Sequence, residues 1–244
     1  MNISKNHPLK SYRAIVFDLD GTLYFQTKLR LMMACRLGGY YCTHFWKLKD
    51  LFAIKKFREV REHWDEIIKS SKDGLTQESQ CNQNHVSAKL DEAQYQYVAS
   101  EMNLPVERVR AAVEGWMYEK PLTTLVECRD EALVDLINAI RECGIPIMIY
   151  SDYPVEDKLN ALDIKADQIY SALDENIMSL KPDPKGLQTI LSENQFKPSD
   201  ILMIGDRMSK DGQAAINAGV DYIILEKSAT ARERLYAELL TELD

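Results

Sequence analysis

Five short apolar runs constrain the fold of this 244-residue chain more than any other feature. They lie at residues 14–17, 145–150, 168–170, 201–204 and 222–225. The last four are separated from one another by roughly a helix length of amphipathic or polar sequence, which is typical of strands that alternate with helices. Parallel strands need such a helix to return the chain to the same end of the sheet. The pattern predicts an α/β fold whose parallel sheet is covered by helices on both faces.

The segment between the first two runs has a different character. From Phe25 to about Lys120 no strand-like run occurs, and apolar residues recur at helical spacing. Helices are expected within residues 50–69, 86–102 and 105–117, and a polar loop is expected at residues 70–85. We therefore predict an α/β core domain, residues 1–25 and 121–244, and an all-α domain, residues 26–120, inserted after the first strand.

Composition and charge narrow the class of protein. The net charge of −8 argues against nucleic acid or an anionic membrane as the main partner of the whole surface. The most apolar stretch, residues 29–46, is interrupted by Arg30 and Arg36 and falls short of a membrane span. Five scattered cysteines without a Cys-x-x-Cys pair are expected to be free, buried thiols. These features predict a cytoplasmic protein with no nucleic-acid and no membrane partner.

Reactive side chains stand just beyond the ends of the predicted strands. In parallel α/β sheets, ligands bind at the carboxyl ends of the strands, so these side chains are candidates for one shared site. The set contains carboxylates, a hydroxyl and an amine: Asp18, Asp20, Ser151, Lys181, Asp206 and Asp211.

This combination of residues predicts a metal-assisted reaction on a phosphate group. Two carboxylates brought close together would repel by about 4 kcal/mol at a protein-like dielectric, and a hard cation such as Mg²⁺ relieves that repulsion. Ser151 and Lys181 supply a hydroxyl donor and a positive charge, which suit the oxygens of a phosphoryl group. A carboxylate could then attack phosphorus to give an aspartyl-phosphate. One of the two aspartates at residues 18 and 20 would attack, and the other would move protons.

The same residues resemble the four motifs of the haloacid dehalogenase (HAD) superfamily, in their order. They are DLDGT at residues 18–22, Ser151 after a strand, Lys181 downstream, and GDRMSKD at residues 205–211. The resemblance implies a Rossmann-like, doubly wound parallel sheet. It also implies that Asp18 is the nucleophile, that Asp20 is the general acid and base, and that Ser151 and Lys181 bind the phosphoryl group.

The resemblance further implies a magnesium site and a cap. The ion would bind the carboxylates of Asp18 and Asp206 and the backbone carbonyl of Asp20, with Asp211 close by. The helical insert is similar to the type-one cap of the superfamily, although it is longer than the compact version. Members that cleave carbon–halogen bonds generally lack an aspartate at the position of Asp20, so its presence here favours phosphate ester chemistry.

We predict a Mg²⁺-dependent phosphatase that hydrolyses a small cytosolic phosphomonoester, a phosphorylated metabolite, through an aspartyl-phosphate. One alternative is a phosphomutase, which hands the phosphoryl group to a sugar hydroxyl instead of to water. A second alternative is a non-catalytic binding module. The sequence predicts neither the substrate nor the oligomeric state.

The first half of the insert is basic and aromatic. Residues 28–72 contain eleven Lys or Arg against five Asp or Glu. The interleaved aromatic residues are Tyr40, Tyr41, Phe45, Trp46, Phe52, Phe57 and Trp64. This pattern suits a surface for an anionic or aromatic leaving group, or for membrane headgroups. We favour helices with an apolar core face and a solvated basic face.

Overall fold

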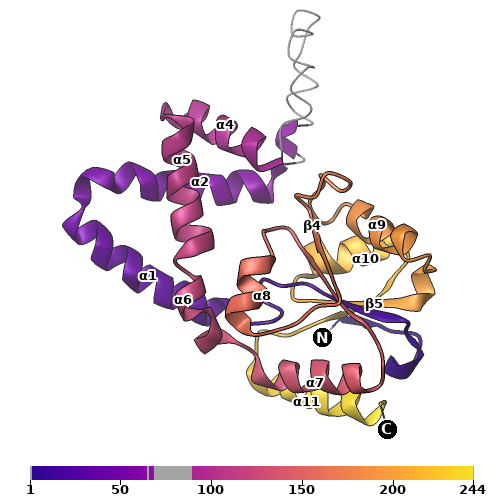
Figure 1. Ribbon diagram of the computed structural model, residues 1–244. Coiled ribbons are helices and arrows are strands. Elements are labelled where there is room, and N and C mark those ends of the chain that lie inside the picture. The colour runs from indigo at the N-terminus through magenta and orange to yellow at the C-terminus, as the bar shows by residue number, and fades with distance from the viewer. Residues whose placement is uncertain (1, 65, 69–89, 244) are drawn as a thin grey trace, which may run out of the picture. The chain divides into compact units, whose positions relative to one another are not determined.

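The computed structural model describes residues 2–64, 66–68 and 90–243. The chain forms two compact units (Figure 1). Met1–Met32 and Leu122–Asp244 make up the first, here called the core unit, and Met33–Pro121 make up the second, the helical unit. Each unit is described by itself below.

A six-stranded sheet forms the centre of the core unit, in the order β1-β6-β5-β2-β3-β4. Five strands are parallel: β2 (Ala14–Phe17), β3 (Ile147–Ser151), β4 (Gln168–Ser171), β5 (Ile201–Gly205) and β6 (Asp221–Ile224). They confirm the five predicted strands and the α/β class. The short β1 (Asn2–Ser4), which the sequence did not predict, pairs antiparallel with β6. An edge strand of this kind is held by backbone hydrogen bonds, so it needs no apolar run.

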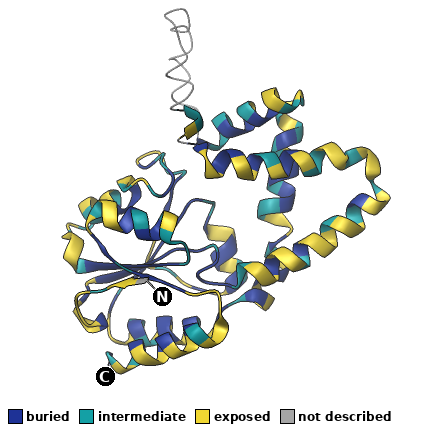
Figure 2. Ribbon diagram, turned by 180° about the vertical axis from the view of Figure 1, so that it is seen from behind, coloured by how far each residue is buried: buried dark blue, intermediate teal, exposed yellow. Residues whose placement is uncertain are grey.

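Helices cover both faces of this sheet. In Figure 1, α7 (Glu131–Glu142) and α11 (Ala229–Thr241) lie on one face, and α9 (Lys185–Glu193) and α10 (Gln213–Ala218) lie on the other. The connection after β3 forms α8 (Glu156–Leu162). Because both faces are covered, β2, β3 and β5 are buried along their whole length, which explains their continuous apolar runs. These strands are dark blue in Figure 2.

Shorter elements complete the core unit. Three 3-10 turns, η1 (Leu9–Ser11), η5 (Val126–Cys128) and η6 (Pro198–Asp200), and the short helix α6 (Leu122–Leu125) connect the larger elements. A π-helical turn, η7 (Met208–Gly212), follows β5 and leads directly into α10. Irregular helical turns of this kind often occur at functional sites.

The helical unit is built around α2. Helix α1 (Gln26–Thr43) begins in the core unit and ends in the helical unit, where the 3-10 turn η2 (Phe45–Lys47) joins it to α2 (Leu48–Glu62). Ala53, Ile54, Phe57 and Val60 form the buried stripe of α2, which contacts α4 (Leu90–Met102) and α5 (Val106–Val113). A π-helical turn, η4 (Glu114–Glu119), continues α5. The loop expected at residues 70–85 lies outside the described residues.

The interleaved aromatic residues of the helical unit do not share one core face. Phe57 and Trp64 are buried as expected, but Phe45, Trp46 and Phe52 are exposed. The expectation of a single apolar core face is therefore wrong for these three residues. Phe45 and Trp46 lie on the turn η2, and Phe52 lies outside the buried stripe of α2.

The structure also bears on the expectations for the cysteines and for membrane-spanning helices. Cys128 is a buried free thiol, but Cys35, Cys42 and Cys143 are free and exposed, and Cys81 lies outside the described residues. The expectation that the cysteines are buried is wrong for these three. In the part of the chain that the structure describes, no helix is both long enough and apolar enough to cross a membrane.

Candidate active site

Three carboxylates from different parts of the chain meet at the carboxyl edge of the sheet. Asp18 follows β2, Asp206 follows β5, and Asp211 lies in η7. The strands β2 and β5 are neighbours, with Phe17 opposite Ile204, and the backbone N–H of Asp18 donates to the carbonyl of Ile204. One carboxylate oxygen from each aspartate lies within 4.8 Å of the other two. Three of the predicted site residues are therefore brought together.

Lys181 lies between two of these carboxylates. Its side chain is 1% exposed, and its Nζ donates to Oδ1 of Asp18 at 2.5 Å and to Oδ1 of Asp211 at 2.6 Å. Its backbone N–H donates to Asp152, and this hydrogen bond holds the backbone of the lysine in place. A buried ammonium needs such partners, because an unpaired charge in the interior is very costly. Lys181 is therefore fixed beside the candidate nucleophile.

The remaining charge of the cluster fits a bound cation. Oδ1 of Asp206 is buried and accepts no hydrogen bond from any residue that the structure describes. Burial and the charge of Asp211 raise the pKa of Asp206 to about 6, and the same two causes raise the pKa of Asp18 well above its usual range. A raised pKa means that the surrounding groups do not fully balance the negative charge of the ionised carboxylate. Oxygen ligands of this type are those that Mg²⁺ prefers, so Asp18, Asp206 and Asp211 are suited to hold such an ion.

The cluster is expected to lose affinity for a divalent cation by about tenfold per pH unit below about pH 6, with Mg²⁺ as the test ion. A carboxyl with a raised pKa takes up a proton at higher pH, and the neutral group no longer attracts the cation. Calorimetric titration of Mg²⁺ at pH 5, 6 and 7.5 would measure this dependence. The Asp206→Asn variant should bind weakly at every pH and show a shallower dependence. An affinity that is constant from pH 7.5 to 5 would contradict the assignment.

Backbone geometry brings the first motif close to Asp206. Gly21 has φ = +98°, a conformation that side chains disfavour, and a Cβ at this position would lie 2.4 Å from Oδ2 of Asp206. Only glycine allows the loop after β2 to lie against the carboxylate without displacing it. Thr22, the next residue, donates from Oγ1 to Oδ2 of Asp18 at 3.0 Å and so orients the candidate nucleophile.

A buried arginine from the last helix holds the same loop. Arg232 of α11 is 3% exposed, and its guanidinium donates to the carbonyls of Gly21 at 2.6 Å and Thr22 at 3.2 Å. It also forms an ion pair with the buried Asp130 at 3.1 Å, and Tyr236 donates to the same carboxylate at 3.0 Å. Arg232 is thus a positioning residue for the loop that follows β2. Sequence reasoning did not identify it, because an arginine in an amphipathic helix resembles a surface residue.

The Asp20 side chain is not part of the carboxylate cluster. It accepts two hydrogen bonds from Nζ of Lys158, at 2.6 and 2.8 Å, and one from the hydroxyl of Tyr24. Burial favours the neutral acid, but the charge of Lys158 and the bonds from both partners outweigh burial and lower the pKa of Asp20. Asp20 is therefore held as a carboxylate. Lys158 and Tyr24 were not recognised in the sequence; the only signal was a lysine on the first helix after Ser151.

Ser151 ends β3, the strand next to β2, and is 1% exposed. Its Oγ accepts a hydrogen bond from the backbone N–H of Tyr153 at 3.1 Å, so it closes the turn after the strand. The hydroxyl proton can still be donated. The strand register places Ser151 at the same edge of the sheet as Asp18, and its role in phosphoryl binding stays a prediction.

Comparison with known proteins identifies the family. The family model of haloacid dehalogenase-like hydrolases matches residues 12–219, which is most of the chain and contains all six predicted site residues, from Asp18 to Asp211. The chain belongs to this family. The resemblance seen in the four motifs is therefore confirmed, and the protein is a hydrolase of the HAD superfamily.

Solved structures of HAD hydrolases share the fold. A 2-haloacid dehalogenase from Pseudomonas syringae has a TM-score of 0.57 and 14% sequence identity, with 96% of this chain and 100% of that chain covered. A predicted phosphoglycolate phosphatase from Haemophilus somnus has a TM-score of 0.53 and 16% identity, with 96% and 99% covered. CbbY from Rhodobacter sphaeroides, solved in complex with xylulose-(1,5)bisphosphate, has a TM-score of 0.50 and 16% identity, with 89% and 88% covered. No curated protein matched the chain.

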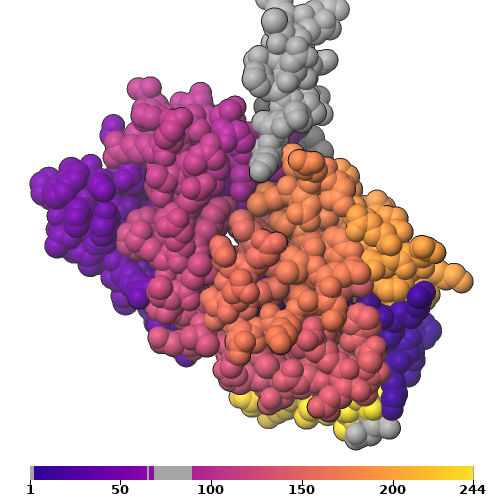
Figure 3. Space-filling model, in the orientation of Figure 1, coloured from indigo at the N-terminus to yellow at the C-terminus, as the bar shows by residue number. Residues whose placement is uncertain are grey.

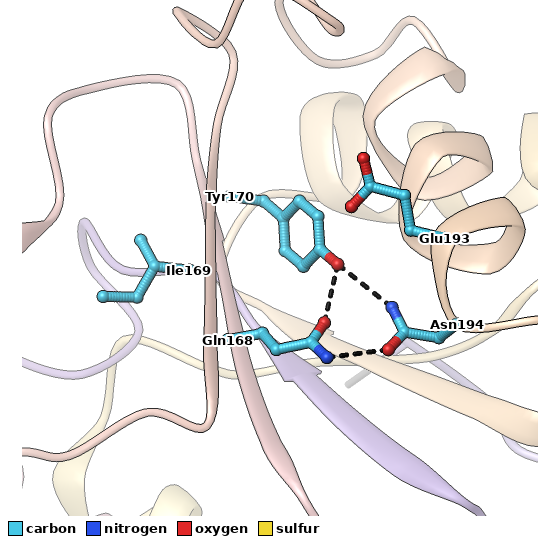
Figure 4. A pocket seen from close by; sticks show the side chains of 5 residues that line it. All are labelled: Gln168, Ile169, Tyr170, Glu193 and Asn194. Atoms are coloured by element: carbon cyan, nitrogen blue, oxygen red, sulfur yellow. Dashed lines mark hydrogen bonds between the residues drawn. The ribbon is translucent and has the colours of Figure 1, made fainter.

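A pocket beside β4 is separate from the site of this HAD hydrolase. Gln168, Ile169, Tyr170, Glu193 and Asn194 line it (Figure 4). The Tyr170 hydroxyl donates to Gln168 and accepts from Asn194, and Gln168 in turn donates to Asn194. These polar groups satisfy one another. The pocket contains none of the predicted site residues, so the carboxylate cluster remains the candidate active site.

Proposed function

We propose that the protein is a Mg²⁺-dependent phosphatase that hydrolyses a small cytosolic phosphomonoester through an aspartyl-phosphate. The observation that carries the proposal is the position of Lys181, whose buried ammonium lies 2.5 Å from Oδ1 of Asp18. Such a charge can bind a phosphoryl oxygen beside a carboxylate that attacks phosphorus. The adjacent Oδ1 of Asp206, which accepts no hydrogen bond from the described residues, supports a cation at the same place.

The reaction follows from the roles of four residues. In the first step, Asp18 forms a bond to phosphorus while the ester bond breaks, and Asp20 gives a proton to the leaving oxygen from its protonated form, which its lowered pKa makes the minor one. In the second step, Asp20 takes a proton from water, which attacks the aspartyl-phosphate, releases inorganic phosphate and regenerates Asp18. Ser151 and Lys181 hold the phosphoryl oxygens through both steps. A bound magnesium ion would add positive charge beside those oxygens.

Lys158 is expected to control the proton transfers of Asp20. Its replacement by methionine removes the nearest positive charge, so the pKa of Asp20 should rise. The limb of the kcat/KM–pH profile that Asp20 governs should then move to higher pH by about 1–3 units. Lys158→Arg should restore much of the native profile, and Lys185→Met, at an exposed lysine, should leave it unchanged. A native profile in Lys158→Met would mean that the ion pair does not act in turnover.

The helical insert, residues 26–120, is proposed to act as a cap. A cap excludes water while phosphorus is attacked and admits one water for the second step. The similarity in fold to a predicted phosphoglycolate phosphatase and to CbbY, which was solved with a sugar bisphosphate, supports a small phosphorylated metabolite as substrate.

The proposal is tested by release of inorganic phosphate from p-nitrophenyl phosphate and from a panel of sugar phosphates and nucleotides. We expect turnover with Mg²⁺ and none after chelation, with activity restored when Mg²⁺ is added back. A requirement for a hexose bisphosphate, without net phosphate release, would identify a phosphomutase instead. Folded protein that turns over no compound with Mg²⁺ would overturn the phosphatase assignment and favour a binding module.

A further inference from the structure

Four large apolar side chains of the helical unit project into solvent within eight residues. Phe45, Trp46, Leu48 and Phe52 are 68%, 60%, 43% and 59% exposed, and we call them the aromatic patch. Phe45 and Trp46 contact each other edge to face, with ring centroids 5.3 Å apart. Single exposed apolar residues are common on proteins, but clustered ones mark interaction sites.

The aromatic patch is not part of the face that α2 packs against the other helices of the helical unit. Helix α2 already buries Ala53, Ile54, Phe57 and Val60 against α4 and α5. Leu48 and Phe52, one turn apart, lie on the exposed side of the same helix. Helix α2 is therefore apolar on two sides at its beginning, and only one of them is covered by the helical unit. In Figure 3 the purple stretch that contains the patch forms part of the surface of this unit.

Positive charge surrounds the patch, although the whole chain carries a net charge of −8. Residues 28–61 contain nine Lys or Arg and two Asp or Glu. Both acidic residues are paired: Asp50 with Arg108 at 2.6 Å, and Glu59 with Lys55 at 3.8 Å. Lys49 and Lys55 are exposed on α2 beside Phe52. Lys49 and Lys55 thus place positive charge beside the exposed apolar side chains, whereas the buried Arg61 of the same helix is paired with Asp91.

We propose that the aromatic patch and its lysines dock the protein on the surface of an anionic lipid bilayer. Exposed Trp, Phe and Leu side chains can enter the boundary between headgroups and acyl chains, while the lysines contact the anionic headgroups. A second copy of the chain fits this surface less well, because a two-fold contact would bring the same lysines together. The proposal does not depend on the phosphatase activity. It replaces, for this face alone, the expectation of no membrane partner, which rested on the charge of the whole chain.

The docking is tested with the full chain and vesicles. The protein is sedimented with vesicles of phosphatidylcholine and phosphatidylglycerol in a 7:3 ratio, and with vesicles of phosphatidylcholine alone. Trp46 gives a second readout, because Trp64 and Trp116 are each only 8% exposed. We expect binding to the anionic vesicles, a shift of tryptophan emission to shorter wavelength, and release by high salt. Trp46→Phe should keep most of the binding and lose the shift.

Matched variants separate the patch from general surface effects. Lys49→Glu/Lys55→Glu should lower the partition coefficient by at least about 30-fold. The double variant Lys165→Glu/Lys185→Glu, which changes the net charge equally at exposed lysines of the core unit, should leave binding close to native. Phe45→Ser/Phe52→Ser should reduce binding, whereas Ile216→Ser, at an exposed residue of α10, should not.

Three outcomes would overturn the proposal. The first is folded protein that does not sediment with anionic vesicles at low salt. The second is equal loss of binding in the patch variants and in the core-unit controls. The third is a dimer, seen by analytical ultracentrifugation without vesicles, that the Phe45→Ser/Phe52→Ser variant abolishes, because the patch would then be the contact between two copies.

Discussion

Replacement of Asp18 by asparagine is expected to lower kcat/KM for p-nitrophenyl phosphate by at least about 10⁴-fold. The amide oxygen is a poor nucleophile, so the aspartyl-phosphate cannot form. The variant also removes one charge from the carboxylate cluster, so its affinity for Mg²⁺ should fall. Phosphate release and calorimetric titration of Mg²⁺ would measure the two effects separately.

The control for Asp18→Asn is Asp157→Asn, which makes the same chemical change at an exposed position of α8 and should keep native activity. Circular dichroism would verify that both variants are folded. Turnover by Asp18→Asn within tenfold of the native rate would contradict nucleophilic catalysis by Asp18. It would leave the fold and the family assignment intact.

Replacement of Arg232 by methionine is expected to lower the free energy of unfolding by about 3–5 kcal/mol. The variant leaves Asp130 as an uncompensated buried charge, and it leaves the carbonyls of Gly21 and Thr22 without their donor. For a chain of this size the loss corresponds to a decrease in Tm of about 10 °C. Denaturation in urea at pH 7 would measure it.

Arg13→Met is the matched control for this prediction. Arg13 forms its ion pair with Asp200 at 3.5 Å, and its side chain is 58% exposed, so its replacement should cost no more than about 1 kcal/mol. Arg232→Met should in addition reduce activity under conditions where the protein is folded, because the loop that carries Asp20 loses its anchor. A loss of stability no larger than that of Arg13→Met would show that Arg232 does not hold the loop.

The sequence by itself determined the sheet and the chemical type of the site. The runs at residues 14–17 and 201–204 are apolar throughout because both faces of their strands are covered, so the sequence alone indicates these strands. The aspartates that follow them were expected at one edge of the sheet, because parallel strands end there, and the pairing of the two strands brings these aspartates together. By contrast, β1 pairs through its backbone and carried no apolar signal.

Only the tertiary structure decided which partners each reactive group has. The Lys158–Asp20 ion pair joins residues 138 positions apart, and the bonds from Arg232 to Gly21 join residues 211 positions apart. Nothing in the sequence distinguishes Lys158 or Arg232 from a lysine or an arginine on the solvated surface. The same holds for the aromatic residues of α2, because spacing places Phe52 and Phe57 on a helix but does not show which side the neighbouring helices cover. The spacing of apolar residues in the sequence indicates which residues of one helix or strand are buried. Which side chains pair, and which side of a helix its neighbours cover, depends on elements far apart in the chain.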